Sequence, residues 1–362
     1  MSAHLYVTWP VSGYDSGLLL AHVLSSILPA SQVMAAAARV RLERQLPSGE
    51  GLGKLAAVAE RLAAARHTPR PRLTRRTALL CAADHGVAWP GIDLGIDGPA
   101  AAALRLIAAG EAAVSAAARS ADAHLVLVDA GVRGGAELEL GRGVMGFRLA
   151  DGTASITEGP AMSEETARHG IETGIALAMA LADAGLDVLA LGQVGPGGDV
   201  ASGALIAALT GAGAAEVAGN EADAAVTAQA LAANAGAVAA LSAGPGADAA
   251  IGALAAFGGL EVALQVGVIL AAASIHVPVV LDDSGTWASA LVAAALAPAA
   301  RDYLIAAHGG ARPGHRRALR ALGLDPLFDL GLAHGEGTGA LLALPLLDAA
   351  ARVLVELGPI VR

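Results

Sequence analysis

Short apolar segments that alternate with longer helical segments are the feature of this sequence that most restricts its fold. Five short segments are apolar along most of their length: Thr77–Ala82, His124–Asp129, Asp187–Gly192, Val277–Leu281 and Tyr303–Ala307. Strands of this kind are buried on both faces, and helical connections of ten or more residues join them into parallel βαβ units. The sequence therefore predicts an α/β fold, with a parallel Rossmann-like sheet and helices on both of its faces.

The predicted helices fill the chain between and around these strands. They lie at Gly17–Leu28, Met34–Leu46, Ala100–Ser120, Ser163–Ala184, Val200–Thr210, Ala224–Leu241, Ala247–Ser274, Gly285–Leu296 and Gly339–Leu357. Ser163 is a candidate N-cap, and Glu164 and Glu165 follow it in the first turn, where the helix dipole favours acids. We expect Pro345 to interrupt the last helix.

An Arg- and Pro-rich connector at His67–Arg76 marks the main predicted boundary along the chain. Residues 1–75 form an N-terminal helical segment before it, and residues 76–330 carry the strand and helix alternation of the sheet domain. Residues 331–362 form a C-terminal segment with a glycine-rich motif and the closing helix.

Composition excludes several classes of protein. Hydrophobic residues make up 55% and charged residues 15%, which excludes an intrinsically disordered chain. A formal charge of -10 argues against a nucleic-acid partner. The mean hydropathy of +0.58 makes a membrane span at Val262–Val280 worth testing, but no Lys or Arg cluster flanks it. The single cysteine, Cys81, forbids an internal disulfide, so we expect a soluble cytoplasmic protein without membrane association.

Residues that follow the strands are the candidates for ligand binding, because ligands bind beyond the carboxyl ends of parallel strands. Asp84, His85 and Gly86 follow the first predicted strand. The Asp-His pair can polarise a ligand or hold a loop. Alternatively, the aspartate caps the turn and the histidine bonds to backbone carbonyls.

A glycine-rich turn, Gly192–Asp199, follows the third predicted strand and leads into a helix. Unpaired backbone amides at a helix N-terminus bind anions. The turn is neither a Walker loop nor a dinucleotide fingerprint, since the lysine is absent and the spacing differs. Asp199 lies where it would compete with an anion, so a tight turn with an aspartate cap is equally compatible with the pattern.

A second glycine-rich motif, Gly335-Glu336-Gly337-Thr338-Gly339, precedes the last predicted helix. Glycines let a ligand approach the backbone, and a carboxylate in such a place can act as a general base. The alternative is a glutamate that only caps the helix dipole.

Positive charge is absent from the middle of the chain. No Lys or Arg lies between Arg168 and Arg301, whereas eleven acids do. A phosphate bound to this part of the chain must therefore be held by backbone amides and helix ends, or by arginines from elsewhere.

Several long stretches resemble the nicotinate-nucleotide–dimethylbenzimidazole phosphoribosyltransferase family, and they span about Gly51 to Leu357. The matching stretches are Gly51–Ala63, Ala82–Val87, Asp151–Ala178, Leu186–Gly192, Phe257–Asp282 and Leu296–Leu347. The resemblance implies a parallel-sheet domain with a smaller helical domain from the N- and C-terminal segments, and a homodimer. It implies no cofactor and no metal.

The resemblance also implies a reaction. Glu336 would accept a proton from a benzimidazole-type base while the other ring nitrogen attacks C1′ of nicotinate mononucleotide, expelling nicotinate with inversion and giving α-ribazole phosphate for the cobamide lower ligand. The substrate-binding candidates are Asp84, His85, Gly86, Gln193, Gly195, Gly197, Gly198, His308, Gly335, Gly337 and Thr338.

The substrate loops depart from the family pattern. The usual Glu-Met-Gly-Ile-Gly-Asn-Thr-Thr reads Gln193–Val200 here, and Gly219–Asp223 replaces a Gly-Arg-Gly-Thr-Gly loop. His308–His315 replaces His-Arg-Ser-x-Glu-Pro-Gly-His, and Asp93–Ala100 replaces the segment that covers the base. We expect Asp199 and Glu221 to weaken phosphate binding.

These departures leave three functions open. The first is the family reaction itself, and the second is the same chemistry with another base or a less charged donor. The third is a catalytically weak paralogue that binds a ligand or serves as a subunit of a heteromer. A dinucleotide dehydrogenase is excluded, because no G-x-G-x-x-G motif follows the first strand.

Overall fold

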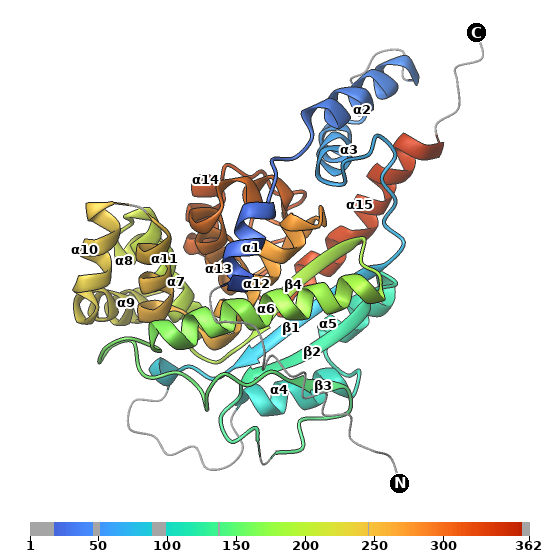
Figure 1. Ribbon diagram of the computed structural model, residues 1–362. Helices are drawn as coiled ribbons and strands as arrows, with labels where there is room; N and C mark the ends of the chain where they lie inside the picture. Colours follow the sequence, from blue (N-terminus) through green and yellow to red (C-terminus); the bar gives the residue numbers. More distant parts are fainter. Residues whose placement is uncertain (1–17, 46–50, 89–98, 137, 245, 357–362) are drawn as a thin grey trace.

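The computed structural model describes residues 18–45, 51–88, 99–136, 138–244 and 246–356. Its centre is a sheet of six parallel strands in the order β3-β2-β1-β4-β5-β6 (Figure 1). The strands are β1 (Arg76–Ala83), β2 (His124–Gly131), β3 (Val144–Gly146), β4 (Val188–Val194), β5 (Val279–Leu281) and β6 (Leu304–Ala306). The predicted α/β fold is confirmed. Only β3 was not expected, because its residues Val144–Gly146 are only partly buried and do not form an apolar run like those of β5 and β6.

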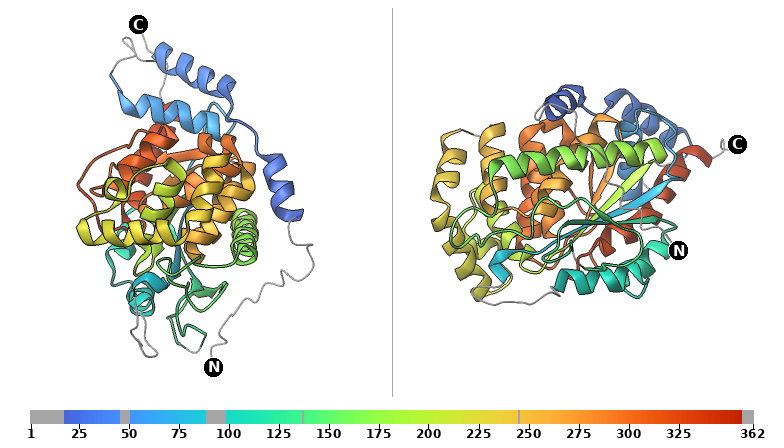
Figure 2. Two further views of the ribbon diagram at one scale, coloured as in Figure 1. Left: turned by 90° about the vertical axis from the view of Figure 1, so that its left-hand side faces the viewer. Right: turned by 60° about the horizontal axis from the view of Figure 1, so that its bottom comes forward.

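Helices cover both faces of the sheet (Figure 2). The helices packed on the first face are α1 (Leu18–Ser26), α6 (Glu164–Ala184), α7 (Gly198–Thr210), α11 (Ala247–Phe257), α12 (Leu260–Ser274) and α13 (Ser284–Leu296). The helices that contribute to the core on the second face are α2 (Gln32–Gln45), α3 (Lys54–Ala65), α4 (Pro99–Ala108), α5 (Ala113–Ser120) and α15 (Thr338–Glu356). Leu79 and Cys81 of β1 join the first core, and Leu80 and Ala82 the second, which explains strands that are apolar throughout.

The remaining four helices among the described residues border the first core, and the first three of them lie at the left in Figure 1. They are α8 (Ala214–Val217), α9 (Glu221–Ala233), α10 (Ala235–Ala243) and α14 (Pro313–Leu322). Short 3-10 turns occupy Gly86–Ala88 and Pro298–Tyr303. The helices α2, α3 and α15 pack together at the opposite end. The division into residues 1–75, 76–330 and 331–362 stays a prediction.

Four expectations about helices need correction. The helix predicted for 100–120 divides into α4 and α5 near Gly110, which has a φ of 80°. The helix predicted for 247–274 divides at Gly258 and Gly259, and the one predicted for 224–241 is α9 and α10, bent by 73°. Pro345 lies inside a continuous α15. It faces solvent, so the carbonyl that loses its hydrogen bond can be hydrated. The N-cap at Ser163 is confirmed, since its side chain accepts from Thr166 N.

Two helical stretches among the described residues are long and apolar enough to cross a membrane, judged by length and composition alone: Pro99–Ser120 and Thr338–Glu356. The helix α15 buries Leu341, Leu344 and Leu347 in the second core, so packing inside the protein accounts for its apolar face. The segment 262–280, considered above as a span, forms most of α12 and then β5, and it is buried almost throughout.

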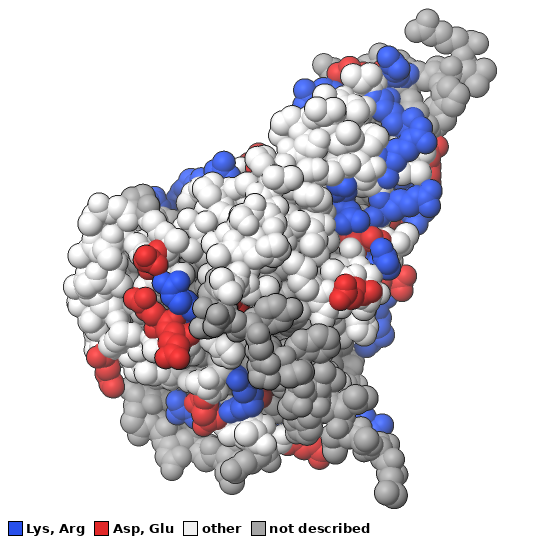
Figure 3. All heavy atoms as spheres, viewed as in Figure 1, with Lys and Arg blue, Asp and Glu red and all other residues white. Residues whose placement is uncertain are grey.

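Charged side chains are unevenly distributed. Lys and Arg gather at the end formed by α2, α3 and α15, whereas the part over α7 to α11 shows mostly uncharged atoms with a cluster of acidic side chains (Figure 3). The basic residues are dispersed over one end of the molecule and do not form a continuous groove in this view.

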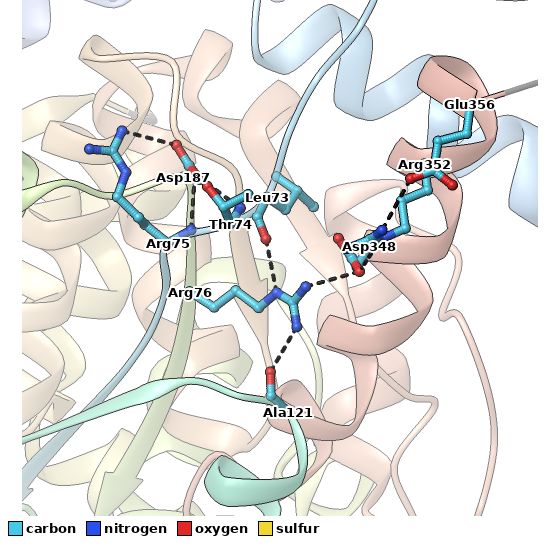
Figure 4. A network of polar contacts seen from close by, with 9 residues as sticks. All are labelled: Leu73, Thr74, Arg75, Arg76, Ala121, Asp187, Asp348, Arg352 and Glu356. Atoms are coloured by element: carbon cyan, nitrogen blue, oxygen red, sulfur yellow. Dashed lines mark hydrogen bonds and ion pairs between the residues drawn. The ribbon is translucent and has the colours of Figure 1, made fainter.

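A polar network fixes α15 to the start of β1 (Figure 4). The Arg76 guanidinium donates to Leu73 O and Ala121 O, both at 2.9 Å, and pairs with Asp348 at 2.9 Å. Asp348 also accepts from Arg352 at 2.7 Å. Arg76 lies at the opposite end of β1 from Asp84, so these contacts join α15 to the sheet without involving the carboxyl ends of the strands.

Asp187 lies just before β4, the strand next to β1, at the same end of the sheet as Arg76 (Figure 4). Its carboxylate accepts from Thr74 N at 3.0 Å and from Arg75 N at 2.9 Å. Burial alone would raise the pKa of Asp187, but these donors and the charge of Arg66 outweigh burial and lower it. The neighbouring strands β1 and β4 are thereby tied together where both begin.

The helices α6 and α12 touch through their backbones. A Cβ atom added at Gly267 would overlap the carbonyl oxygen of Ile171, and one added at Gly174 would overlap that of Leu264. Small residues at these crossing points let the two helices approach more closely than side chains allow. This contact explains how a core with 2% aromatic residues can be filled.

We expect Gly267→Ala to destabilise the protein by about 1–3 kcal/mol or more, because the added methyl group must push α6 and α12 apart. The matched control is Gly236→Ala in α10, where nothing lies within 4 Å of the added Cβ. That substitution should stabilise the helix by about 0.5–1 kcal/mol. Urea unfolding of both variants checks this, and equal stabilities would contradict the close contact.

Candidate functional site

The carboxyl ends of β1, β4, β5 and β6 carry the polar residues that the sequence singled out. The strand order reverses direction between β1 and β4, and in such sheets a ligand binds in the crevice at this switch point. His85 follows β1, the turn Gly195–Gly198 follows β4, and His308 follows β6. The topology therefore brings segments separated by more than two hundred residues to one edge of the sheet.

The Gly335–Gly337 loop lies directly on β4. A Cβ atom at Gly192 would overlap the backbone of Glu336 and Gly337. Gly335, Glu336 and Gly337 have φ values of 75°, 59° and 79°, so three consecutive residues adopt the left-handed conformation. Glycine on both sides of Glu336 is what allows this turn to form.

Glu336 is held in a strained backbone conformation at this loop. A left-handed glutamate costs energy that the surrounding structure must supply, and such residues cluster at functional sites. Its carboxylate is 22% exposed and lies 3.2 Å from His334 Nε2. Within the residues that the structure describes, no bond joins this carboxylate to the first turn of α15. This geometry gives no sign of a helix cap, and the acid–base role of Glu336 stays a prediction.

Thr338 is the first residue of α15, directly after this loop. Its hydroxyl is buried and has no hydrogen-bond partner among the described residues. A polar group of this kind beside Glu336 is free to bond to a ligand that enters the crevice.

His308 forms a buried pair with Asp282 beneath the start of α15. His308 Nε2 lies 2.8 Å from Asp282 Oδ1, and Gly310 N donates to His308 Nδ1 at 3.1 Å. Since Nδ1 accepts a hydrogen bond, Nε2 carries the proton that is donated to Asp282. A Cβ at Gly339 would overlap both members of the pair. The pair therefore packs against Gly339 in the first turn of α15 and so helps to position the preceding Glu336 loop.

Asp283 connects β4 to the helix α13. Its carboxylate accepts from Gln193 N at 2.9 Å and caps α13 by accepting from Thr286 N at 3.0 Å. Burial, reinforced by the charge of Asp282, raises the pKa of Asp283 well above its ordinary value. A Cβ at Gly335 would lie 3.3 Å from Asp283 Cβ, so Asp283 also contacts the Glu336 loop.

A second buried array lies under the glycine turn. His85 Nε2 lies 2.8 Å from Glu261 Oε1. In the orientation of the Gln193 amide that satisfies both of its neighbours, the nitrogen donates to Glu261 Oε1 at 3.2 Å and the oxygen accepts from Gly285 N at 3.3 Å. Burial lowers the pKa of His85, but Glu261 and then Asp84 and Asp199 raise it, and the net pKa is raised.

The imidazole of His85 packs against the backbone of the turn Gly195–Gly198. Cβ atoms at Gly195 and Gly198 would lie 3.2 Å and 3.3 Å from His85 Nε2. Gly197 is left-handed, with a φ of 81°, and precedes the first residue of α7. The predicted anion-binding turn thus lies between the His85 imidazole and the backbone amides at the start of α7.

Asp84 and Gly86 hold the neighbouring loop. Asp84 Oδ2 accepts from Arg133 N at 2.8 Å, and burial raises the pKa of Asp84. A Cβ at Gly86 would press against the backbone of residues 153–155. Asp84 and His85 are 0% and 1% exposed, so the structure shows them supporting the neighbouring turns. Their direct contact with substrate stays a prediction.

Some residues at this edge were not anticipated. Asp282, Asp283 and Ser284 directly follow a predicted strand, a position that should have marked them as candidates. Glu261 and Arg312 carried no such signal, because neither follows a strand. The segment expected to cover the base, residues 93–100, lies almost wholly outside the described residues. Within the described ranges, no group of three or more His, Cys, Asp or Glu could hold a metal ion.

Comparison with known proteins identifies close relatives along the whole length. A sequence model of a phosphoribosyltransferase family matches residues 27–359. The nicotinate-nucleotide–dimethylbenzimidazole phosphoribosyltransferase of Roseiflexus sp. (strain RS-1) is 38% identical over 339 residues, covering 94% of this chain and 96% of the relative. The enzyme of that name from Chloroflexus aggregans is also 38% identical, over 344 residues. The crystal structure of CobT from Thermus thermophilus matches with a TM-score of 0.81 and 37% identity, covering 89% of this chain and 96% of that one.

We expect Glu261→Gln to lower the pKa of His85, because burial would then act against the imidazolium with less opposition. A raised pKa means that His85 stabilises the fold below its unfolded pKa of about 6.5 and that this contribution is lost as the pH rises through the folded pKa. NMR titration of the imidazole measures the shift. The control is Glu165→Gln, at an exposed position of α6. An unchanged pKa in Glu261→Gln would contradict the pairing.

Proposed function

The chain belongs to the nicotinate-nucleotide–dimethylbenzimidazole phosphoribosyltransferase family, and we propose that it transfers the phosphoribosyl group of nicotinate mononucleotide to 5,6-dimethylbenzimidazole or a related base. The product is α-ribazole phosphate, which supplies the lower ligand of cobamides. The observation that carries this proposal is the left-handed Glu336 on the end of β4, in a chain 38% identical to enzymes of that name.

The reaction forms one bond at C1′ and breaks one. A ring nitrogen of the benzimidazole attacks C1′ from the face opposite nicotinate. The bond between C1′ and the nicotinate nitrogen breaks, and its electron pair stays on nicotinate. The configuration at C1′ changes from β to α, and the proton on the other ring nitrogen passes to the Glu336 carboxylate.

The side chains of this site supply orientation and one proton acceptor. A pyridinium leaving group needs no proton, so a single general base and correct placement of two substrates are sufficient. Gly335 and Gly337 let the substrates approach the backbone around Glu336. The Asp282–His308 pair and Asp283 keep the loop in place against β4.

The proposed partners are small molecules, without nucleic acid, membrane or cofactor. A soluble enzyme in the cytoplasm agrees with the burial of the most apolar helices against the sheet. The single cysteine, Cys81, is buried and free, which suits a reducing compartment.

Glu336→Gln should lower turnover by about 100- to 10,000-fold, because the amide keeps the shape of the side chain but accepts no proton. The measurement is release of nicotinate from nicotinate mononucleotide with dimethylbenzimidazole. Folding should be unaffected, with Glu158→Gln as a control at an exposed glutamate. Near wild-type turnover with a lowered melting temperature would leave Glu336 with only a structural role.

The same assay separates the active enzyme from a weak paralogue. The wild-type protein is expected to release nicotinate when assayed alone. Turnover that appears only after co-expression with a family homologue would instead favour a heteromer, and nicotinate release with another base would favour a different acceptor.

We further propose a homodimer that buries the flanking helices. Leu18, Leu28, Val33 and Val40 on the segment of α1 and α2 are 63%, 54%, 71% and 44% exposed. Such a run of apolar side chains gains from burial against a second copy. Light scattering at micromolar concentration should give twice the chain mass of 35.5 kDa. A strictly monomeric species would contradict the proposal.

A further inference from the structure

Four helices begin around one small hollow beside the glycine turn. They are α7, α9, α13 and α14, and the residues from their first turns that line the hollow are Asp199, Asp223, Ser284 and Gly314. Helix N-termini carry partial positive charge and unpaired amides. The hollow is therefore surrounded by the positive ends of helices from several parts of the chain.

An ion pair occupies this hollow. Arg312 Nη2 lies 2.8 Å from Asp199 Oδ2, with 35% and 42% of the two side chains exposed. Ser284 donates its hydroxyl to the other oxygen, Asp199 Oδ1, at 2.8 Å. The carboxylate thus takes the place beside the arginine and the helix ends that an external anion would otherwise take.

Arg312 is the only cationic side chain among the described residues that line the hollow. The chain has no Lys or Arg from 169 to 300, so α7, α9 and α13 contribute none. His315 lies close by, with its Nε2 3.4 Å from Ser284 Oγ. Burial, together with His308, lowers the pKa of His315 to about 3, so this imidazole is neutral. Positive charge on a side chain at this place depends on Arg312.

We propose that Arg312 selects a donor that carries a phosphate, by leaving Asp199 and pairing with the phosphate of the nucleotide. This inference rests on the proposed function and deepens it, because it assigns donor specificity to a residue outside the Glu336 loop. Asp199 is then the internal counterion that holds Arg312 until the donor binds.

The strengths of the two interactions favour the exchange of Asp199 for a phosphate as the partner of Arg312. Partly exposed ion pairs change an equilibrium constant by only a few-fold, whereas hydrogen bonds from a guanidinium to a phosphate are charge-assisted and frequently bidentate. The hollow has a volume of only about 10 Å³, which is close to one water molecule. Arg312 and Asp199 both line this space, so we expect their side chains to separate when a phosphate binds there.

The hollow also lies where a nucleotide could reach the Glu336 loop. Ser284 lines it, and the preceding residue, Asp283, contacts Gly335 of the Glu336 loop. A donor with its phosphate at Arg312 can therefore extend past this helix start toward Glu336. In this proposal Arg312 binds the phosphate, and Asp199 is its counterion before the donor binds.

The test is binding of nicotinate mononucleotide and of its dephosphorylated nucleoside, nicotinate riboside, measured by calorimetry on the full chain. Arg312→Gln should weaken binding of the mononucleotide by about 10- to 100-fold and leave binding of the riboside unchanged within about twofold. The matched control is Arg320→Gln, an exposed arginine in the last turn of the same helix, which should change neither affinity.

Asp199→Asn tests the counterion. Releasing Arg312 should tighten binding of the mononucleotide by about two- to fivefold, without a matching change for the riboside. Equal weakening of both ligands in Arg312→Gln, or tighter binding of the riboside than of the mononucleotide by the wild type, would overturn the inference. Because binding is measured directly, a wild type that discriminates through Arg312 but releases no nicotinate would refute the proposed function and leave this inference intact.

Discussion

Contact between backbones, with no side chain between them, is the constraint on which the rest of this structure depends. In the core, Gly174 and Gly267 let α6 and α12 touch over the first face of the sheet. At the ligand-binding edge, Gly192 lets the Glu336 loop lie directly on β4. A side chain at any of these positions would separate elements that must touch. The abundance of glycine therefore serves the site as well as the packing.

Buried acids form the second layer of support for the site. Asp282 holds His308, Asp283 holds the backbone of Gln193, and Glu261 holds His85. Each acid has a donor that offsets much of the cost of burial. These pairs determine the positions of the glycine turn and of the Glu336 loop, which carry the groups proposed to bind the substrates. Rigid supporting contacts of this kind orient the groups of a functional site.

Most strands and helices of this fold could be predicted from the sequence, whereas breaks within helices and contacts between distant residues could not. Strands such as β1 and β4 are apolar throughout because both faces are covered, and this pattern is readable. Breaks within apolar helices, as at Gly258 and Gly259, leave the apolar pattern unchanged and so escaped notice. The ion pair of Asp199 and Arg312 joins positions more than a hundred residues apart, and only the packing of α7 against α14 brings them together.

The exchange of Glu for Gln at position 193, compared with the usual family pattern, has a physical consequence at this edge. The Gln193 amide lies 3.2 Å from Glu261 Oε1 and donates to it. A carboxylate at the same place would be a buried like charge, and the two acids would have to share a proton. With glutamine, the Glu261 carboxylate accepts from the amide and stays paired with His85 beneath the glycine turn. Compared with the family pattern, this turn thus lacks the acid at position 193 and has a new acid at position 199. The carboxylate of Asp199 is paired with Arg312, which lies just before α14.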